Sequence, residues 1–417
     1  MIVSIADAPW LNAPETRAVM AALELARKGG SRFVGGCVRN TLMGREADDI
    51  DIATQLLPMQ VMSAAQAAGL VAVPTGIEHG TITIVSNHVP HEVTTLRRDV
   101  STDGRRATVA FTREWSEDAQ RRDFRMNALY AAPNGEVFDP VGGGVEDVRA
   151  GRVIFVGDPD TRLREDVLRI LRFFRFNAWY GAGELDKAGL EACARHAASL
   201  DTLSVERVWK EIKKTLAAPD PRAALAAMEA AGARARALPE AGEQARVFGV
   251  IAIEAECFFA PDAMARLAAG LKDQAGARAL AQRLKLSNDE RARLVGATGA
   301  DEPIAASLSP RETRRILYKI GWQAFRDRVL RAWAEAGADK NAPDWRALLA
   351  FGENWTQPKL PLSGEDILAA GAAPGPMVGR AMRAIEQWWI AEDFPEDRGA
   401  ILERLKIVVR ELGESRA

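Results

Sequence analysis

Gly35-Gly36-Cys37-Val38-Arg39, followed by Asp49-Ile50-Asp51, is the stretch of this chain that most constrains its fold. Alternate side chains of a β-strand point to opposite faces, so a strand over residues 49–53 projects Asp49 and Asp51 together and turns Ile50 into the core. Two carboxylates on a rigid strand suit Mg²⁺, which binds a few carboxylates together with phosphate oxygens. The glycine pair before them predicts a tight turn into a helix start that can face a phosphate.

The composition limits the class of protein. The chain has 417 residues, more than one hydrophobic core usually supports, so we expect roughly two to four domains. With 27% charged residues and a net charge of −2, it has an ordinary globular composition that does not by itself indicate nucleic-acid binding. Three scattered cysteines predict neither disulfides nor a zinc site. No apolar run is long enough for a membrane span and the first residues lack a signal-peptide pattern, so we expect a cytoplasmic protein.

The first 140 residues have the pattern of an α+β domain. Helical periodicity and runs of β-branched residues alternate there, and two hairpins are indicated, one of them at Asn134-Gly135. We expect helices at 14–28, 39–43 and 58–68, and strands at 32–34, 49–53, 80–85, 91–96, 128–130 and 137–138. Strands with helices on one side make a compact head with a mixed sheet.

From about residue 157 the pattern is almost wholly helical. Residues 163–178 carry an apolar stripe at helical spacing, and later alanine-rich helices are separated by breaks that contain proline. We therefore expect an α+β head over residues 1–140, followed by an all-helical neck over 141–215, body over 216–310 and tail over 311–417.

The acidic pair has a structural alternative. Asp48, Asp49 and Asp51 can form a solvated turn or pair with arginines. Against this, like charges side by side are unfavourable unless a cation offsets them, and the flanking isoleucines favour a strand. A second β-branched strand that lies beside the first brings Glu92 to the same place as a third carboxylate.

Further motifs follow the glycine turn and the aspartates in a fixed order. They are Arg121-Arg122-Asp123-Phe124-Arg125-Met126-Asn127, Arg164-Glu165-Asp166-Val167-Leu168-Arg169 and Ser204-Val205-Glu206-Arg207. Together they resemble the tRNA nucleotidyltransferase and poly(A) polymerase family of the polymerase β-like nucleotidyltransferase superfamily, and within it the class II CCA-adding members. The resemblance covers about the first half of the chain most clearly. It implies that the head has the polymerase β-like fold and that the protein is an enzyme.

The resemblance implies two-metal nucleotidyl transfer. Asp49, Asp51 and Glu92 are the expected catalytic residues and the ligands of two Mg²⁺ ions. The triphosphate and the ribose are expected to contact six residues: Gly35, Gly36, Arg39, Arg122, Asp123 and Asn127. Asp123 is suited to accept from a 2′-hydroxyl and so to favour ribonucleotides. The structural alternative for residues 121–127 is that they are only the charged start of a helix.

Arg164, Asp166, Arg169 and Arg172 are the remaining nucleotide-binding residues that the resemblance implies. Asp166 and Arg169 are three residues apart, which predicts one face of a helix. Taken alone, this spacing favours an ordinary intrahelical ion pair. In the family's pattern the carboxylate accepts from the exocyclic amine of cytosine or adenine and the guanidinium donates to the ring, so the protein itself selects CTP and ATP. Arg172, one turn further along, is expected to face the phosphates.

Two features favour full CCA addition within the family. The stretch Val73-Pro74-Thr75-Gly76 continues as in CCA-adding members, without the arginine-rich run of poly(A) polymerases, and a charged loop over residues 97–120 is retained. The expected partners are tRNA, CTP and ATP, with the tail contributing to tRNA binding, and neither a membrane nor an obligate protein partner is indicated. CC-adding, A-adding and poly(A)-polymerase relatives stay open as alternatives. An inactive RNA-binding module is the alternative from a different class.

Overall fold

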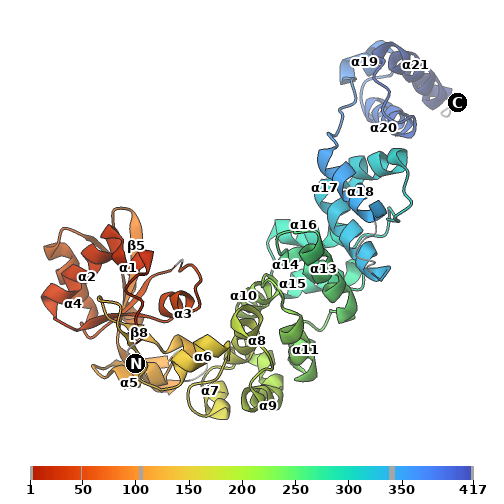
Figure 1. The fold of residues 1–417 in the computed structure, drawn as a ribbon. Helices are drawn as coiled ribbons and strands as arrows, with labels where there is room; N and C mark the ends of the chain where they lie inside the picture. The colour runs from red at the N-terminus through yellow and green to blue at the C-terminus, as the bar shows by residue number, and fades with distance from the viewer. Residues whose placement is uncertain (1–2, 48, 103–106, 338–342, 415–417) are drawn as a thin grey trace. The chain divides into compact units, whose positions relative to one another are not determined.

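A computed structural model describes residues 3–47, 49–102, 107–337 and 343–414 of the chain. The chain divides into two compact units, Met1–Pro239 and Glu240–Ala417, which Figure 1 draws from red to green and from green to blue. Each unit has its own core and is described separately. Among the described residues, no helix combines the length and the apolar character that a bilayer crossing requires.

A mixed seven-stranded sheet forms the centre of the first unit. Its strand order is β3-β4-β5-β2-β1-β8-β9. Strands β2 and β5 are parallel and every other neighbouring pair is antiparallel, which confirms the predicted mixed sheet. The bounds are β1 (Ser31–Val34), β2 (Asp51–Thr54), β3 (Val71–Gly76), β4 (Thr81–Ser86), β5 (Val89–Thr95), β8 (Tyr130–Ala131) and β9 (Val137–Phe138).

Both predicted hairpins are present. Strands β4 and β5 pair across the two-residue turn Asn87-His88, in which both residues have positive φ. Such turns match the right-handed twist of the strands they join. Strands β8 and β9 pair around the Asn134-Gly135 turn. Strand β3 was not predicted, because most of its side chains are exposed and Pro74 interrupts its β-branched run.

Helices α2 (Pro14–Ala26) and α4 (Pro58–Ala67) pack on one face of this sheet, as Figure 1 shows. The buried side chains Ile52, Val93 and Ile82 on neighbouring strands supply the apolar surface that they cover. Both helices start with proline, whose fixed φ suits the first helical turn. The alternating residues Asp51 and Glu92 therefore face away from these helices.

The segment predicted as a charged loop, residues 97–120, consists largely of regular secondary structure. It contains a second, two-stranded sheet and a short helix: β6 (Arg97–Thr102), β7 (Ala107–Phe111) and α5 (Trp115–Gln120). Residues 103–106, the middle of the predicted loop, lie outside the described residues. The prediction of a loop is therefore wrong for the described part of the segment.

The rest of the first unit is helical. Its remaining α-helices are α1 (Pro9–Asn12), α3 (Gly36–Leu42), α6 (Gly144–Ala150), α7 (Pro159–Glu165), α8 (Arg169–Tyr180), α9 (Lys187–His196), α10 (Val205–Leu216), α11 (Arg222–Ala230) and α12 (Ala233–Ala237). Short 3₁₀-helices are η1 (Ile77–His79), η2 (Arg125–Asn127) and η3 (Ala197–Thr202). The predicted continuous helix over residues 163–178 is instead two helices, α7 and α8, with a break between them.

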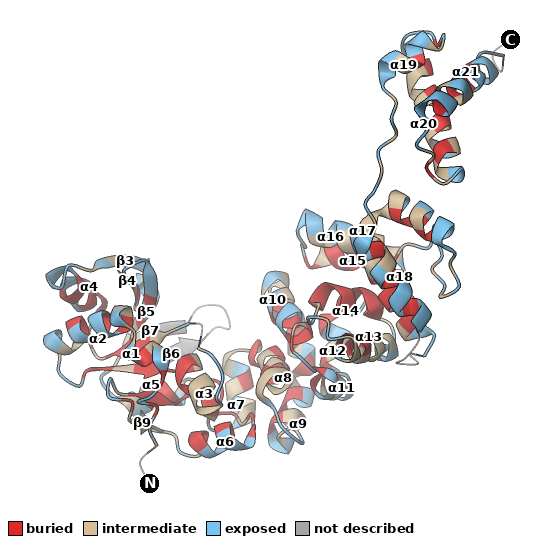
Figure 2. Ribbon diagram, turned by 45° about the horizontal axis from the view of Figure 1, so that its top comes forward, coloured by how far each residue is buried: buried red, intermediate tan, exposed pale blue. Residues whose placement is uncertain are grey.

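The second unit is built from helices alone in its described residues. They are α13 (Gln244–Glu256), α14 (Ala263–Gly270), α15 (Gln274–Arg283), α16 (Asn288–Ala297), α17 (Pro310–Glu335), α18 (Pro343–Asn354), α19 (Gly364–Ala369), α20 (Pro376–Ala391) and α21 (Arg398–Glu414). Helix α14 is buried over its whole length, and Figure 2 colours it red. The all-helical C-terminal region is confirmed, whereas the four-part division with boundaries after residues 140, 215 and 310 stays a prediction.

Candidate nucleotidyl-transfer site

A glycine turn carries two arginines close to its backbone. Gly35 has a φ of +72°, a conformation that glycine adopts without strain, and immediately precedes α3. A Cβ atom built on Gly35 would lie 3.6 Å from Nη1 of Arg122, and one on Gly36 would lie 3.8 Å from Nη2 of Arg39. The structure thus places both predicted phosphate-binding arginines at the predicted turn.

The parallel pairing of β2 with β5 brings two carboxylates together. Asp51 and Glu92 are direct partners in the register of these strands. Burial, the nearby Glu92 carboxylate and Asp49 raise the pKa of Asp51 to about 6, and Arg122 acts in the opposite direction. The predicted meeting of Asp51 with Glu92 is thereby confirmed. Burial is the largest cause of the raised pKa of Asp51, and repulsion by the Glu92 carboxylate adds to it.

Asp49 lies just outside the strand that carries Asp51. Strand β2 begins at Asp51, and Asp49 lies exposed in the segment before it. Ile50, predicted to enter the core, is only partly buried, whereas Ile52 is fully buried. The strand starts two residues later than predicted, because pairing with β5 begins at residue 51 and pairing with β1 at residue 52. Asp49 still lies close enough to affect the pKa of Asp51.

Mg²⁺ suits these residues by the chemistry of their donors. Within the residues described, no three His, Cys, Asp or Glu side chains are grouped so that they could hold a metal ion by themselves. Mg²⁺ does not need such a group, because it usually keeps several waters and takes one or two carboxylates plus substrate phosphates. A cation between Asp51 and Glu92 would relieve the repulsion that raises the pKa of Asp51. The pair therefore fits Mg²⁺.

Asp123 lies in a buried network and has no free acceptor site. Its Oδ1 accepts from the Phe124 N–H at 2.8 Å and from Asn127 Nδ2 at 3.0 Å, and its Oδ2 accepts two bonds from Arg172, one of them at 2.8 Å. Burial disfavours the charged form, but Arg172 and these donors lower the pKa of Asp123 to about 2. A carboxylate offers about four acceptor sites, so a ribose hydroxyl must displace one of these donors to reach it.

Arg39 and Arg172 also bind protein groups. Arg39 is buried and donates to Asn127 Oδ1, Asn40 Oδ1 and, at 2.8 Å, the Tyr180 hydroxyl. Arg39 Nε also donates to Asn40. Together these bonds use four of the five N–H donors of Arg39 and leave one unused. Arg39 thus connects the glycine turn to α8. Arg172, predicted to face the phosphates, is held by Asp123 through Nε and Nη2.

Arg122 is fixed by a second buried network. It donates to the Asp118 carboxylate at 3.0 Å and to the Tyr130 hydroxyl at 3.2 Å. Burial opposes the ionised form of Asp118, but Arg122 and Arg121 hold the pKa of this carboxyl well below its usual range. Asp118 and Tyr130 were not among the predicted site residues. Asp118 stands four residues before Arg122, a spacing that is typical of ion pairs and could have indicated it, whereas Tyr130 reaches Arg122 from strand β8.

The predicted base-selecting residues do not lie on one helix face. Helix α7 ends at Glu165, Asp166 has extended backbone angles, and α8 starts at Arg169. Asp166 Oδ1 accepts from the Leu168 N–H at 3.1 Å, a local bond of the kind by which aspartate competes with helix. The predicted single helix is therefore wrong, and the alternative of an intrahelical ion pair between Asp166 and Arg169 is excluded as well. Arg164 lies exposed near the end of α7.

Asp166 and Arg169 each have another charged partner. Arg207 of α10 donates to both carboxylate oxygens of Asp166, at 2.9 and 3.0 Å, and Arg169 donates to Glu165 at 2.7 Å. Arg169 is also buried and donates to the main-chain oxygen of Arg121 at 3.0 Å. Arg207 and Glu165 occur inside the recognised motifs, but the sequence alone did not reveal which groups they contact.

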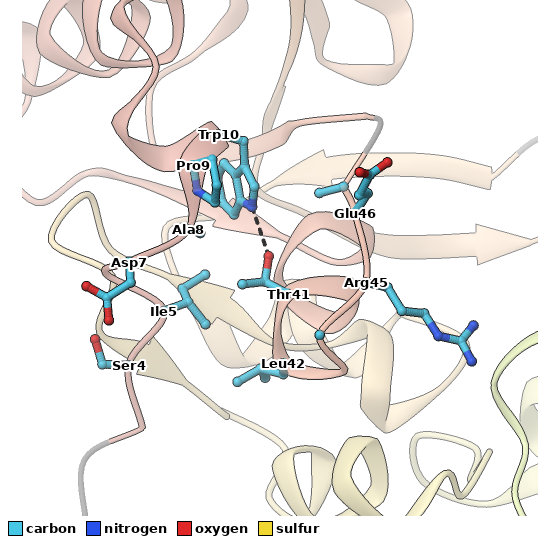
Figure 3. A pocket seen from close by; sticks show the side chains of 12 residues that line it. Ser4, Ile5, Asp7, Ala8, Pro9, Trp10, Thr41, Leu42, Arg45 and Glu46 are labelled. Carbon is cyan, nitrogen blue, oxygen red and sulfur yellow. Dashed lines mark hydrogen bonds between the residues drawn. The ribbon is translucent and has the colours of Figure 1, made fainter.

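A large cavity of the first unit lies away from these residues. About 740 Å³ in volume, it is lined by the N-terminal segment, the end of α3 and the loop that follows α3. Figure 3 shows its lining, with Trp10 Nε1 donating to Thr41 Oγ1 at 2.8 Å. None of the site residues predicted from the sequence lines this cavity. This cavity therefore does not mark the predicted site. The positions of the carboxylates and arginines indicate that site instead.

Two family models match the chain. The model described as the poly A polymerase head domain matches residues 31–154, and the model described as a probable RNA and SrmB-binding site of polymerase A matches residues 184–244. The first match spans the glycine turn and the carboxylates.

Relatives cover most of the chain. It is 32% identical to the Mus musculus protein named CCA tRNA nucleotidyltransferase 1, mitochondrial, over 90% of this chain and 86% of that protein. It is 31% identical to the CCA-adding enzyme of Limosilactobacillus fermentum, over 89% and 91% of the two chains. The structure matches that of the Bacillus stearothermophilus CCA-adding enzyme in complex with CTP with a TM-score of 0.76 and 27% identity, over 97% of this chain and 100% of the other. The chain belongs to the class II CCA-adding enzymes, the CCA tRNA nucleotidyltransferases.

Proposed function

We propose that this chain adds CCA to the 3′ end of tRNA from CTP and ATP, without a nucleic-acid template and with release of pyrophosphate. The observation that carries the proposal is the register of Asp51 with Glu92 beside a glycine turn flanked by Arg39 and Arg122. That arrangement combines acidic ligands with cationic groups that suit a triphosphate. The sequence and structural relatives named for CCA addition support the choice of reaction.

The carboxylates Asp51 and Glu92, joined by Asp49, are the proposed ligands of two Mg²⁺ ions. When bound, magnesium lowers the barrier by activating the RNA 3′-hydroxyl and by stabilising the departing pyrophosphate. Arg122, held rigid by Asp118 and Tyr130, orients the triphosphate at the glycine turn. Gly35 and Gly36 leave room for a close approach of the phosphates to the backbone.

The proposed base-reading groups are Asp166 and Arg169. Arg207 leaves an acceptor site on Asp166 Oδ2, which can receive the exocyclic amine of cytosine or adenine. Glu165 and Arg207 act as positioning residues, since each holds one base-reading side chain in place. Arg164, Arg172, Asp123 and Asn127 are proposed to support the nucleotide, with Asp123 exchanging one of its present donors for the ribose.

The proposed neck, body and tail grip the tRNA by shape and phosphates, as duplex RNA is commonly recognised. The cytoplasm is the proposed location. The three cysteines are free, which fits a reducing compartment. Fractionation of the source cells tests this, because enrichment in another compartment would contradict it.

The deciding experiment offers purified protein a tRNA that lacks its terminal CCA, with each NTP alone and in combination, in the presence of Mg²⁺. We expect two C residues from CTP, one further A when ATP is added, and no incorporation of UTP or GTP. Products that stop after CC, receive only A, or extend with many A residues identify the partial and poly(A)-adding relatives. No incorporation with intact tRNA binding identifies an inactive RNA-binding module.

A further inference from the structure

Arg39 is buried at the glycine turn, and the groups that accept its hydrogen bonds are all neutral. Its guanidinium donates to Asn40, Asn127 and Tyr180, and the Tyr180 hydroxyl lies 2.8 Å from Nη2. Arg39 forms no ion pair within the part of the chain that the structure describes. Burial lowers the pKa of Arg39, because water no longer stabilises its charge. A buried cation of this kind is unfavourable until an anion joins it.

Two other arginines beside the same aromatic ring are treated differently. The Phe176 ring of α8 contacts Arg39, Arg172 and Arg175, whose guanidinium carbons lie 5.4, 5.3 and 4.5 Å from its centre. Arg172 donates to the Asp123 carboxylate at 2.8 Å, and Arg175 donates to the Glu211 carboxylate at 2.6 Å. These carboxylates offset the charges of their arginines. The amide and hydroxyl oxygens around Arg39 fix its guanidinium but do not offset its charge.

Tyr180 contacts Arg39 with its ring as well as with its hydroxyl. The Arg39 guanidinium carbon lies 3.9 Å from the centre of the Tyr180 ring, which is a cation–π contact. The neighbouring residue Trp179 fixes this end of α8. Its Nε1 donates to the main-chain oxygen of Lys214 in α10 at 2.7 Å, and its own main-chain oxygen accepts from Arg45 at 2.7 Å. Tyr180 therefore meets Arg39 from a helix end that is tied both to α10 and to the loop after α3.

We propose that Tyr180 is a positioning residue that holds Arg39 for the triphosphate of the incoming nucleotide. The proposal rests on the proposed function, which supplies CTP and ATP as substrates. Tyr180, Asn40 and Asn127 together use four N–H groups of Arg39, so one N–H of Nη1 remains for a phosphate oxygen. A neutral acceptor suits this role, because a carboxylate in its place would compete with the phosphate for the guanidinium.

The place of Tyr180 in α8 connects the triphosphate to the base. Tyr180 is the last residue of this helix, and the proposed base-reading residue Arg169 is the first. One helix thus carries a group for the base at one end and the support of a phosphate-binding arginine at the other. Because CTP and ATP have the same triphosphate, loss of the Tyr180 contact should weaken both by the same factor. Discrimination of CTP against UTP should stay unchanged.

The test compares wild-type protein with Tyr180→Phe, which removes the hydroxyl and keeps the ring. Steady-state addition is measured with CTP on tRNA lacking CCA and with ATP on tRNA lacking only the final A. We expect the KM for each nucleotide to rise about tenfold, as for the loss of a hydrogen bond to a charged group. We expect kcat to change by less than about twofold, because the triphosphate is bound in the ground state and the transition state alike. Unchanged KM values overturn the proposal.

Inorganic tripolyphosphate separates a positioning role from a general loosening of the fold. It has neither base nor ribose, so its inhibition constant in competition with CTP should rise in Tyr180→Phe by about the same factor as the KM. The matched control Tyr318→Phe removes a hydroxyl that donates to Glu386 at 2.7 Å in the second unit. This control should leave the KM and the inhibition constant unchanged. Equal effects of Tyr180→Phe and Tyr318→Phe contradict a specific role.

A double-variant cycle tests whether Tyr180 acts through Arg39. Arg39→Gln should raise the KM for CTP by itself, and adding Tyr180→Phe to Arg39→Gln should cause no further rise. Additive effects overturn the proposal, because they place the action of Tyr180 elsewhere. Fluorescence anisotropy with labelled tRNA should give the same Kd for Tyr180→Phe and wild type. A Kd for tRNA that rises as much as the KM for CTP also overturns it.

The same measurements distinguish this inference from the proposed function. If wild-type protein adds no nucleotide to tRNA lacking CCA, the proposed function fails. If wild-type protein adds CCA and Tyr180→Phe has the KM values of wild type, only the inference fails.

Discussion

Asp51 is the residue on which the proposed chemistry depends most directly. We expect Asp51→Asn to reduce CTP incorporation at least about a thousandfold, because bound metal supplies several kcal/mol and each 1.4 kcal/mol is about tenfold in rate. Binding of tRNA should be nearly unchanged. Single-turnover incorporation and tRNA anisotropy measure the two effects. Incorporation near the wild-type rate would remove Asp51 from the proposed metal site.

The same substitution should stabilise the metal-free protein. The folded state holds the Asp51 proton up to a pKa of about 6, compared with an ordinary 3.8, so wild-type stability falls as pH rises through this window and stays lower above it. Asparagine carries no charge, so Asp51→Asn should gain about 1–2 kcal/mol at pH 7, after allowance for partial exposure, and nothing at pH 4. Denaturation with a chelator present measures this. A gain of equal size at both pH values would contradict it.

Arg207 should control base selection without touching the reaction centre. In Arg207→Gln, Asp166 loses the ion pair that holds its carboxylate. We expect discrimination of CTP and ATP against UTP to weaken about tenfold or more, since bonds to charged groups contribute about 1.5–3 kcal/mol. Arg207→Lys should restore part of it. The control Arg236→Gln breaks an exposed pair with Asp201 and should leave selection unchanged. Unchanged selection in Arg207→Gln refutes the positioning role.

At the level of single residues, the sequence predicted which side chains lie near one another in the site. It did not predict the hydrogen-bond and ion-pair partners that fix their positions. The meeting of Asp51 with Glu92 followed from two strand patterns. The partners Tyr180 and Arg207 did not, because each contact joins residues that are distant in the chain. A contact between separate elements depends on the packing of the whole unit, which local periodicity does not encode.

Among the elements, the β4–β5 hairpin offers a stability prediction. His88 is exposed and has a φ of +67°, and Asn-Gly is the preferred pair for such a turn. We expect His88→Gly to stabilise the protein by about 0.5–1 kcal/mol, because relief of the left-handed strain exceeds the extra chain entropy of glycine. His88→Ala keeps a Cβ and should give no gain. Thermal denaturation of both variants checks this, and equal effects would contradict it.

The elements also show where sequence patterns fail. Both hairpins were predicted correctly, because their turn residues and flanking strands are local signals. The break between α7 and α8 was missed because the apolar stripe continues across it. Only the bond from the Leu168 N–H to Asp166 reveals that a side chain replaces the helical acceptor. Strand β3 was missed because most of its side chains are exposed, so buried and exposed residues do not alternate along it.

For the whole molecule, we expect thermal unfolding in more than one transition, since the two units have separate cores. Gly321 interrupts α17 with a φ of 75° and a ψ of 164°, a region open almost only to glycine, and its Cβ position meets no other atom within 4 Å. Gly321→Ala should therefore destabilise the second unit by about 2 kcal/mol through backbone strain alone. Scanning calorimetry should show one transition lowered and the other unmoved.

Gly379, which lies inside α20, is the matched control for this variant. Gly379→Ala should raise the same transition slightly, because alanine favours a helix over glycine by about 1 kcal/mol. A single transition that moves as a whole in either variant would contradict independent units. The division after Pro239 could not be read from the sequence, because helices lie on both sides and only their packing separates the units.

The parallel pairing of β2 with β5 also has a consequence for folding. These strands are separated in the chain by α4, β3 and β4, so they meet only after a long loop has closed, which is among the slower steps of folding. Until then Asp51 and Glu92 are far apart, and the nascent polypeptide has no place for a divalent ion. An immature copy therefore cannot consume nucleoside triphosphates, and the capacity for catalysis arises together with the native sheet.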